Sequence, residues 1–360
     1  MKTFRILLAV FYCLMIAAKV HPQDLSAMGD SLSPFAVQTL QTRDFDFFSA
    51  DEPLTMSLCF DFKQYLKTRK EPEYMDAILT LELVKGKPVT QKIEIKARGD
   101  VRRVISTFPP IKLKFKENSQ DSAPIRRKGT LKLVTPCNQT THYQNYVLKE
   151  YLAYRMLNLV TPYSFRTRLA RIRYIDAGNP KRSFTNYGFL IENEKDMATR
   201  NDRIIEECKA IPVNHVNPRE LSRVALFNYM IGNTDWAISC QHNVKILKSV
   251  DSTSRNVIPV AYDFDYSGFV GAEYSVPGHN VPVDAVTERY YMGTLCSREE
   301  LQPIIDEFIG LKDEFINTIN LFSLLPKRDQ KDAVNYLDDF YRTKDYYGSF
   351  LSDLSTPVKQ

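Results

Sequence analysis

The sequence predicts an α+β fold with a β-rich N-terminal lobe, residues 56–192, and a mainly helical C-terminal lobe, residues 193–360. Up to about residue 134 the chain consists of short runs that alternate apolar and polar residues, which is typical of antiparallel strands. After about residue 193, apolar residues recur at helical spacing behind clear helix starts. Strands first and helices afterwards favour segregated layers over an alternating α/β sheet.

The first residues predict a signal peptide. Lys2 and Arg5 precede the apolar run Ile6–Ala18, and polar residues follow. This order of charge, apolar run and polar exit is that of a secretory signal, which we place at residues 1–23. The run is shorter than the roughly 20 apolar residues that a bilayer span needs. We therefore expect a secreted, periplasmic or cell-surface protein without an integral membrane segment. Residues 24–55, which follow the signal, are expected to form a polar lead-in to the folded part.

Composition excludes several classes of function. The chain is 44% hydrophobic and 25% charged, as folded proteins are. Its formal net charge of +5 is not gathered into a basic cluster, so no nucleic-acid partner is expected. The cysteines are scattered without a CxxC pair, which argues against a zinc site. The sequence contains no Walker A, GxSxG or EF-hand pattern, and nothing in it specifies an oligomeric state.

Alternation and apolar spacing place the elements along the chain. Strands are predicted at Ala77–Val84, Lys92–Lys96, Lys112–Lys116, Thr130–Val134, Arg168–Ile175 and Tyr187–Ile191. An apolar stripe predicts a helix over Gln144–Leu159, and a further helix is expected over Asp332–Tyr346. Two helix starts are explicit: Asn217 before Pro218 and Glu220, and Ser297 with Glu300 as a capping box.

One stretch gathers the residues with chemistry. Gly232 and Asn233 terminate the helix that begins at Pro218, so Asp235 falls in a tight loop. Val244–Ile246 and Ile258–Tyr262 then form a predicted hairpin. Asn243 stands at its entry, and Asp263 and Asp265 stand at its exit. Three carboxylates and one amide are therefore expected to converge at the ends of one small hairpin.

This order of groups fits phosphoryl transfer. The reaction needs a divalent cation held by carboxylate and amide oxygens, and a carboxylate that orients the attacking hydroxyl and accepts its proton. The segment around Asp235, Asn243 and Asp263 resembles the catalytic region of the CotH-type atypical protein kinases and, more distantly, of HipA-like kinases. These families follow a loop Asp with a downstream Asn, and then with an Asp after a strand.

The resemblance implies a two-lobed protein-kinase-like fold and a kinase that uses ATP with Mg²⁺ or Mn²⁺. By it Asp235 is the catalytic base, Asn243 and Asp263 are metal ligands, and Asp265 assists them. The expected partner is a protein substrate, phosphorylated on Ser or Thr and itself secreted or on the surface.

The first lobe adds three expected nucleotide-binding residues. In kinases a strand Lys pairs the phosphates and is fixed by a helix Glu. Lys132 and Glu150 have that placement, with Lys112 and Lys114 as rivals on a neighbouring strand. Glu192 ends the segment whose backbone would hold the adenine. The sequence departs from protein kinases in having no GxGxxG phosphate loop.

Two other functions stay open. The missing glycine-rich loop is consistent with a non-catalytic member of the same fold, used in binding or surface assembly. Alternatively, His242 with Asp263 and Asp265 would make a metal-dependent phosphohydrolase. Each residue also has an ordinary interpretation, since Asp is common in turns and a Lys on a strand face is usually solvated. The order of the four groups along the chain favours the kinase interpretation.

Overall fold

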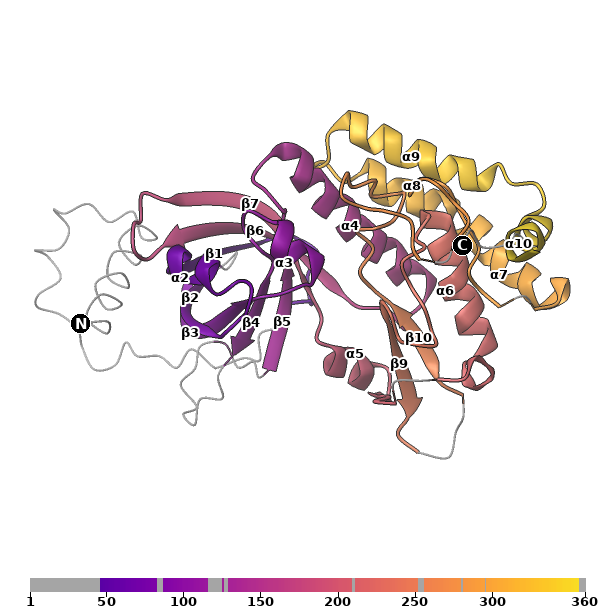
Figure 1. Cartoon of the computed structure of the whole chain (residues 1–360), viewed down its shortest axis with the longest axis horizontal. Coiled ribbons are helices and arrows are strands. Elements are labelled where there is room, and N and C mark those ends of the chain that lie inside the picture. Colours follow the sequence, from indigo (N-terminus) through magenta and orange to yellow (C-terminus); the bar gives the residue numbers. More distant parts are fainter. Residues whose placement is uncertain are drawn as a thin grey trace, which may run out of the picture. The chain divides into compact units, whose positions relative to one another are not determined.

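The computed structural model describes residues 46–82, 87–115, 125, 129–208, 211–251, 256–279, 281–294 and 296–355 (Figure 1). The chain divides into two compact units. The first comprises Met1–Gln139 and Arg168–Leu190, and the second comprises Thr140–Thr167 and Ile191–Gln360. The predicted signal peptide, residues 1–23, and the adjoining part of the lead-in lie outside the described residues.

The first unit is built on a closed seven-stranded barrel in the order β1-β2-β3-β4-β5-β7-β6. Its strands are β1 (Leu54–Phe60), β2 (Met75–Glu82), β3 (Val89–Ala97), β4 (Ile111–Phe115), β5 (Gly129–Val134), β6 (Thr167–Asp176) and β7 (Ser183–Ile191). Two short helices, α2 (Phe62–Lys67) and α3 (Val101–Ile105), accompany them. The pairs from β1 to β5 are antiparallel, as the alternation predicts.

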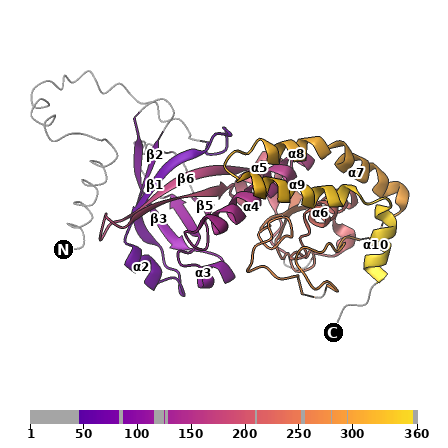
Figure 2. The same cartoon turned by 90° about the horizontal axis from the view of Figure 1, so that it is seen from above.

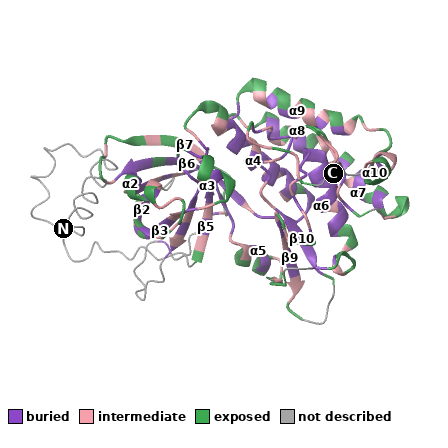
Figure 3. Cartoon of the chain, viewed as in Figure 1, coloured by how far each residue is buried: buried purple, intermediate pink, exposed green. Residues whose placement is uncertain are grey.

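Alternate residues of the barrel strands point inward and fill its interior. Along β4 the residues alternate between buried and half-buried, and β3 does the same over most of its length (Figure 3). The inward side chains form one apolar core in which Leu58, Leu79, Ile93, Ile95, Ile111, Leu113 and Leu133 have no exposed surface. Successive strand residues point to opposite faces, so the same alternation leaves polar side chains on the outer wall.

The predicted two-lobed protein-kinase-like fold, with a β-rich N-lobe and a mainly helical C-lobe, is wrong. The strands close into a mixed barrel because β1 pairs in parallel with β6, from Leu54 opposite Ala170 to Phe60 opposite Asp176. Alternation identifies a strand but not its partner, and partners this far apart in the chain leave no local signal. Most of β1 was also not recognised as a separate strand.

The second unit combines helices with a three-stranded sheet in the order β10-β9-β8. Its helices are α4 (Thr141–Val160), α5 (Glu194–Arg200), α6 (Pro218–Ile231), α7 (Arg298–Gly310), α8 (Lys312–Asn320), α9 (Lys327–Tyr341) and α10 (Tyr346–Ser355). The strands are β8 (Arg203–Ile205), β9 (Val244–Ser249) and β10 (Ile258–Ala261). In Figures 1 and 2, α4 lies beside α8 and α6 lies beside α9, and both pairs are packed.

Several local predictions are confirmed in this unit. Asn217 caps α6 by accepting a hydrogen bond from the N–H of Glu220, with Pro218 at the first helical position. Ser297 and Glu300 form the predicted capping box of α7. β9 and β10 pair antiparallel as the predicted hairpin. These features depend on residues close in sequence, which is why the sequence reveals them.

The helices α2 to α10 differ from membrane-spanning helices. None of them, in the part of the chain that the structure describes, has both the length and the apolar character needed to cross a bilayer.

A substitution at Gly188 in β7 would test how closely the barrel strands approach one another. A Cβ atom there would lie 2.5 Å from the backbone oxygen of Val134 and 3.0 Å from Cδ1 of Ile172. Backbone cannot move aside cheaply, so we expect Gly188→Ala to lower the free energy of unfolding by about 1–3 kcal/mol in denaturant titrations. Gly178→Ala, whose Cβ meets only a side-chain oxygen at 3.5 Å, is the control. Equal stability of the two variants would contradict the close approach.

Candidate active site

The end of α6 positions the loop that carries Asp235. Gly232 adopts the left-handed conformation (φ 64°) and its N–H bonds to the carbonyls of Asn228 and Tyr229. The side chain of Asn233 donates to Oδ1 of Asn228 at 2.8 Å. Its own Oδ1 accepts the N–H of Asp235 at 3.1 Å. Asn228 and Asn233 are almost fully buried, so these bonds fix the loop to the helix.

Two side chains orient the Asp235 carboxylate. Nε2 of His242 lies 2.7 Å from Oδ1, and Nδ2 of Asn243 donates to Oδ2 at 3.0 Å. Nδ2 of Asn243 also donates to the Asp235 backbone carbonyl at 2.8 Å. The Asp235 side chain is still 28% exposed. It is therefore held in a fixed orientation and remains accessible, as a proton acceptor must be.

Asn243 connects this loop to the exit of the hairpin. It precedes β9 directly, and its backbone carbonyl accepts the N–H of Tyr262, the residue before Asp263, at 3.0 Å. Its φ is 50°, in the left-handed region that Asn tolerates better than most residues. Because its amide nitrogen is bonded to Asp235, its amide oxygen is the atom that can serve as a ligand.

The segment Asp263–Phe264–Asp265 is anchored by its central residue. Phe264 has no exposed surface and packs edge-on against Tyr154 of α4, with ring centroids 4.8 Å apart, and against Phe227 of α6, at 5.5 Å. The N–H of Asp263 donates to the Tyr154 hydroxyl at 2.9 Å. Asp263 has a φ of 66° and lies beyond the end of β10, at the exit of the hairpin as the sequence predicts. Such backbone costs about 1–3 kcal/mol and is concentrated at functional sites.

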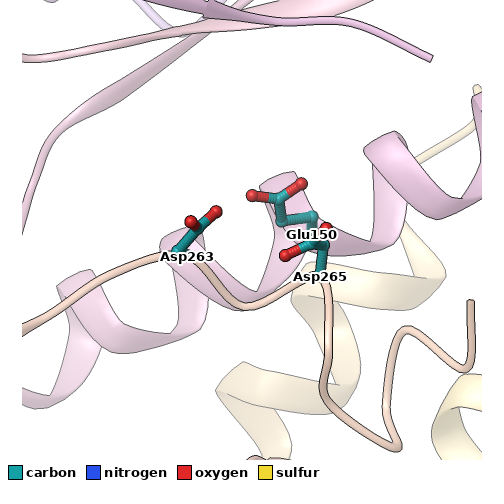
Figure 4. Close-up of side chains that lie close together, drawn as sticks. All are labelled: Glu150, Asp263 and Asp265. Carbon is teal, nitrogen blue, oxygen red and sulfur yellow. The ribbon is translucent and has the colours of Figure 1, made fainter. Parts of the chain in front are cut away.

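Glu150 of α4 joins these two aspartates. It lies one turn before Tyr154, so both side chains project from the same face of the helix toward the Asp263–Asp265 segment. One carboxylate oxygen from each of Glu150, Asp263 and Asp265 lies within 4.8 Å of the others. Figure 4 shows the three carboxylates gathered together. Glu150 has no exposed surface and Asp265 has 5%, whereas Asp263 is half-buried.

This acidic triad, Glu150 with Asp263 and Asp265, has the donor set of a hard divalent cation. Three ionised carboxylates at this separation repel one another, more strongly where little water screens them. Mg²⁺ binds oxygen ligands at about 2.0–2.1 Å, which puts ligand oxygens of one ion about 3–4 Å apart. One oxygen from each of the three carboxylates lies within 4.8 Å of the others, close to that range. The three residues therefore fit Mg²⁺ or Mn²⁺.

No protein-family model matches this chain, and a comparison with curated proteins gives no match either.

Tyrosines border the triad on one side. The Tyr274 hydroxyl donates to Oδ2 of Asp265 at 3.2 Å. The ring of Tyr274 stacks on Tyr143 at 6.2 Å and meets Tyr146 edge-on at the same distance. Lys149 lies over Tyr146, and burial lowers the pKa of its ammonium group. Asp265 is thus bordered by a largely aromatic surface, formed by α4 and by the loop that follows Asp265 in the chain.

The other two predicted nucleotide residues, Lys132 and Glu192, lie in β5 and directly after β7. Lys132 is half-buried on β5 of the barrel, directly opposite Lys112 of β4. Glu192 is 2% exposed, and its carboxylate binds the guanidinium groups of Arg166 and Arg200 at 2.9–3.2 Å. That network ties the residue after β7 to the residue before β6 and to the end of α5. The nucleotide-binding roles of Lys132 and Glu192 stay predictions.

Sequence reasoning placed Asp235, Asn243, Asp263 and Asp265 near one another but assigned Glu150 to a lysine partner. Its position with the two aspartates was missed because α4 is far from the hairpin in sequence. Asn228 was also missed, although a polar residue among the buried side chains of α6 is a usable signal. Tyr154 gave no signal, since a buried aromatic in an amphipathic helix is ordinary core.

Metal binding is directly testable. We expect Mg²⁺ or Mn²⁺ to raise the thermal unfolding temperature of the protein, because a ligand at 100 times its Kd stabilises the folded state by about 2.7 kcal/mol. The Asp263→Asn variant should lose the shift. Asp306→Asn removes an exposed carboxylate from α7 and should keep it. An undiminished shift in Asp263→Asn would show that the cation binds somewhere else.

Proposed function

We propose that this chain transfers a phosphoryl group from ATP, with Mg²⁺ or Mn²⁺, to a Ser or Thr hydroxyl of a protein substrate that is secreted or exposed at a surface. The proposal rests on the site and on the resemblance to CotH-type kinases in its residues, and it does not require the kinase fold. The observation that carries it is the link through Asn243, which bonds Asp235 on one side and the residue before Asp263 on the other.

Asp235 is the proposed base. His242 and Asn243 each occupy one direction at its carboxylate, so the remaining lone pairs point in defined directions. A substrate hydroxyl placed there is oriented by Asp235 and gives its proton to the carboxylate as its oxygen bonds to the γ-phosphorus of ATP. The bond from that phosphorus to the β,γ-bridging oxygen breaks, and ADP leaves with the electron pair. His242 keeps the carboxylate in place and is the positioning residue.

The acidic triad and Asn243 are the proposed cation ligands. Glu150, Asp263 and Asp265 supply carboxylate oxygens, and Asn243 supplies its amide oxygen. A bound cation would neutralise the charge on the phosphate oxygens. The strained backbone at Asp263 and Asn243 is consistent with this role, because it is maintained by the surrounding hydrogen bonds rather than by local preference.

Glu192 is the proposed contact for the adenine of ATP. The Glu192 carboxylate is taken up by Arg166 and Arg200, and its N–H donates to the Arg166 carbonyl at 2.9 Å. The group that Glu192 can still offer an adenine is therefore its backbone carbonyl.

The phosphohydrolase alternative is less well supported. It requires His242 to bind a cation together with Asp263 and Asp265. Nε2 of His242 instead contacts Asp235, and among the described residues the carboxylate that completes the metal cluster belongs to Glu150. A His that orients a base fits transfer to a hydroxyl better than metal-assisted hydrolysis.

The test is transfer of labelled γ-phosphate to a degenerate Ser/Thr peptide library in the presence of Mg²⁺ or Mn²⁺. Label should appear on Ser or Thr, and Asp235→Ala should reduce the rate by on the order of 10²–10⁴-fold, the usual contribution of a positioned base. The fold should be retained, because the carboxylate is at the surface of the loop.

Asp306→Asn is the matched control and should transfer label at the wild-type rate. Full activity in Asp235→Ala would refute its role as the base. A protein that binds ATP and metal but transfers no label to any acceptor would support the non-catalytic alternative.

A further inference from the structure

The outer wall of the barrel has a hollow with an unusual concentration of polar groups. It is formed by residues of β1, β2, β6 and β7 and has a volume of about 380 Å³. Its polar lining consists of Thr55, Ser57, Thr80, Glu82, Arg171, Arg173, Ser183 and Thr185. This volume falls in the range of small-molecule sites. All of these residues belong to the barrel unit.

Strand register explains how the polar groups come together. Thr55 of β1 lies between Glu82 of β2 and Arg171 of β6. One step of the pleat away, Ser57 lies between Thr80 and Arg173. Residues directly opposite on neighbouring strands have their Cβ atoms about 4.5–5.5 Å apart on the same face. Two parallel rows therefore each present a hydroxyl beside a guanidinium, and β7 adds the hydroxyls of Ser183 and Thr185 from the other side.

Two arginines of β6 line the hollow. Within the described part of the chain, neither the Arg171 nor the Arg173 side chain makes a hydrogen bond or ion pair. Elsewhere on the same wall a charge of the same kind is compensated, since Lys114 of β4 pairs with Glu94 of β3 at 3.0 Å. Of the hydroxyls, Thr80 is bonded to Thr90 at 3.0 Å. Polar side chains on an outer strand face are ordinary by themselves, but two exposed arginines that line one hollow and have no partner among the described residues are not.

We propose that this hollow binds a tetrahedral oxyanion, a phosphate or sulfate group, on a small hydroxyl-rich molecule. Two guanidinium groups on one strand face bind such a group through charge-assisted hydrogen bonds, which arginine makes in bidentate geometry. Ser57 and Thr55 donate further hydrogen bonds from the adjacent strand. The hollow exceeds the size of a free phosphate ion, and Glu82 at its far end accepts hydrogen bonds from ligand hydroxyls. The site is independent of the acidic triad.

The experiment is calorimetric titration of the full chain at low ionic strength without divalent cations. The probes are inorganic phosphate, a hexose 6-phosphate, a hexose 6-sulfate and the unmodified hexose. We expect saturable binding of the two esters, and binding of inorganic phosphate that is weaker than theirs. The unmodified hexose should not bind. The double variant Arg171→Gln/Arg173→Gln should weaken ester binding by at least about tenfold, because each lost charge-assisted bond contributes a large share of the affinity.

The matched control is Lys63→Gln/Lys92→Gln, which removes two exposed positive charges from the same unit outside the hollow. It should bind the esters as the wild type does, and thermal unfolding should show that both double variants are folded. The Asp263→Asn variant should also bind normally, which separates this site from the proposed phosphoryl-transfer site. Absence of saturable binding by every oxyanion would overturn the proposal. Equal ester affinity in the wild type and the arginine variant would overturn it too.

Discussion

The second unit depends on one constraint, which is the convergence of three carboxylates from two distant parts of the chain. Glu150 comes from α4, and Asp263 and Asp265 come from the segment after β10, yet their oxygens lie within 4.8 Å. Like charges at that distance oppose folding. The structure holds them there through the buried ring of Phe264 and the hydrogen bond from Asp263 to Tyr154. A bound cation would remove the repulsion among the three carboxylates. The free energy released in this way would favour cation binding, which is why we propose that the triad is a cation site.

A set of amide hydrogen bonds holds Asp235 near the Asp263–Phe264–Asp265 segment. Asn228 fixes Asn233, Asn233 fixes the backbone of Asp235, and Asn243 fixes its carboxylate. Amides supply a donor and an acceptor without adding charge, so they can be buried at low cost when both are satisfied. These bonds fix the loop that carries the proposed base to the end of α6 and to the entry of the β9–β10 hairpin.

The sequence predicted what depends on neighbouring residues. The caps at Asn217 and Ser297, the hairpin and the placement of Asn243 at its entry all follow from local patterns. The predictions were wrong or incomplete where segments far apart in the sequence come into contact. The parallel pairing of β1 with β6 closes the barrel and rules out the expected two-lobed kinase-like fold. The position of Glu150 depends in the same way on packing between α4 and a segment more than a hundred residues later, which periodicity cannot report.

The central claim is that Glu150, Asp263 and Asp265 hold a divalent cation. The most direct measurement is an anomalous difference map from crystals of the protein soaked with Mn²⁺ and a non-hydrolysable ATP analogue. The account predicts a peak among the three carboxylates, with ligand distances near 2.2 Å, slightly longer than the roughly 2.0–2.1 Å of Mg²⁺. A well-ordered map with no peak at the triad, or with Mn²⁺ bound only by other residues, would contradict it.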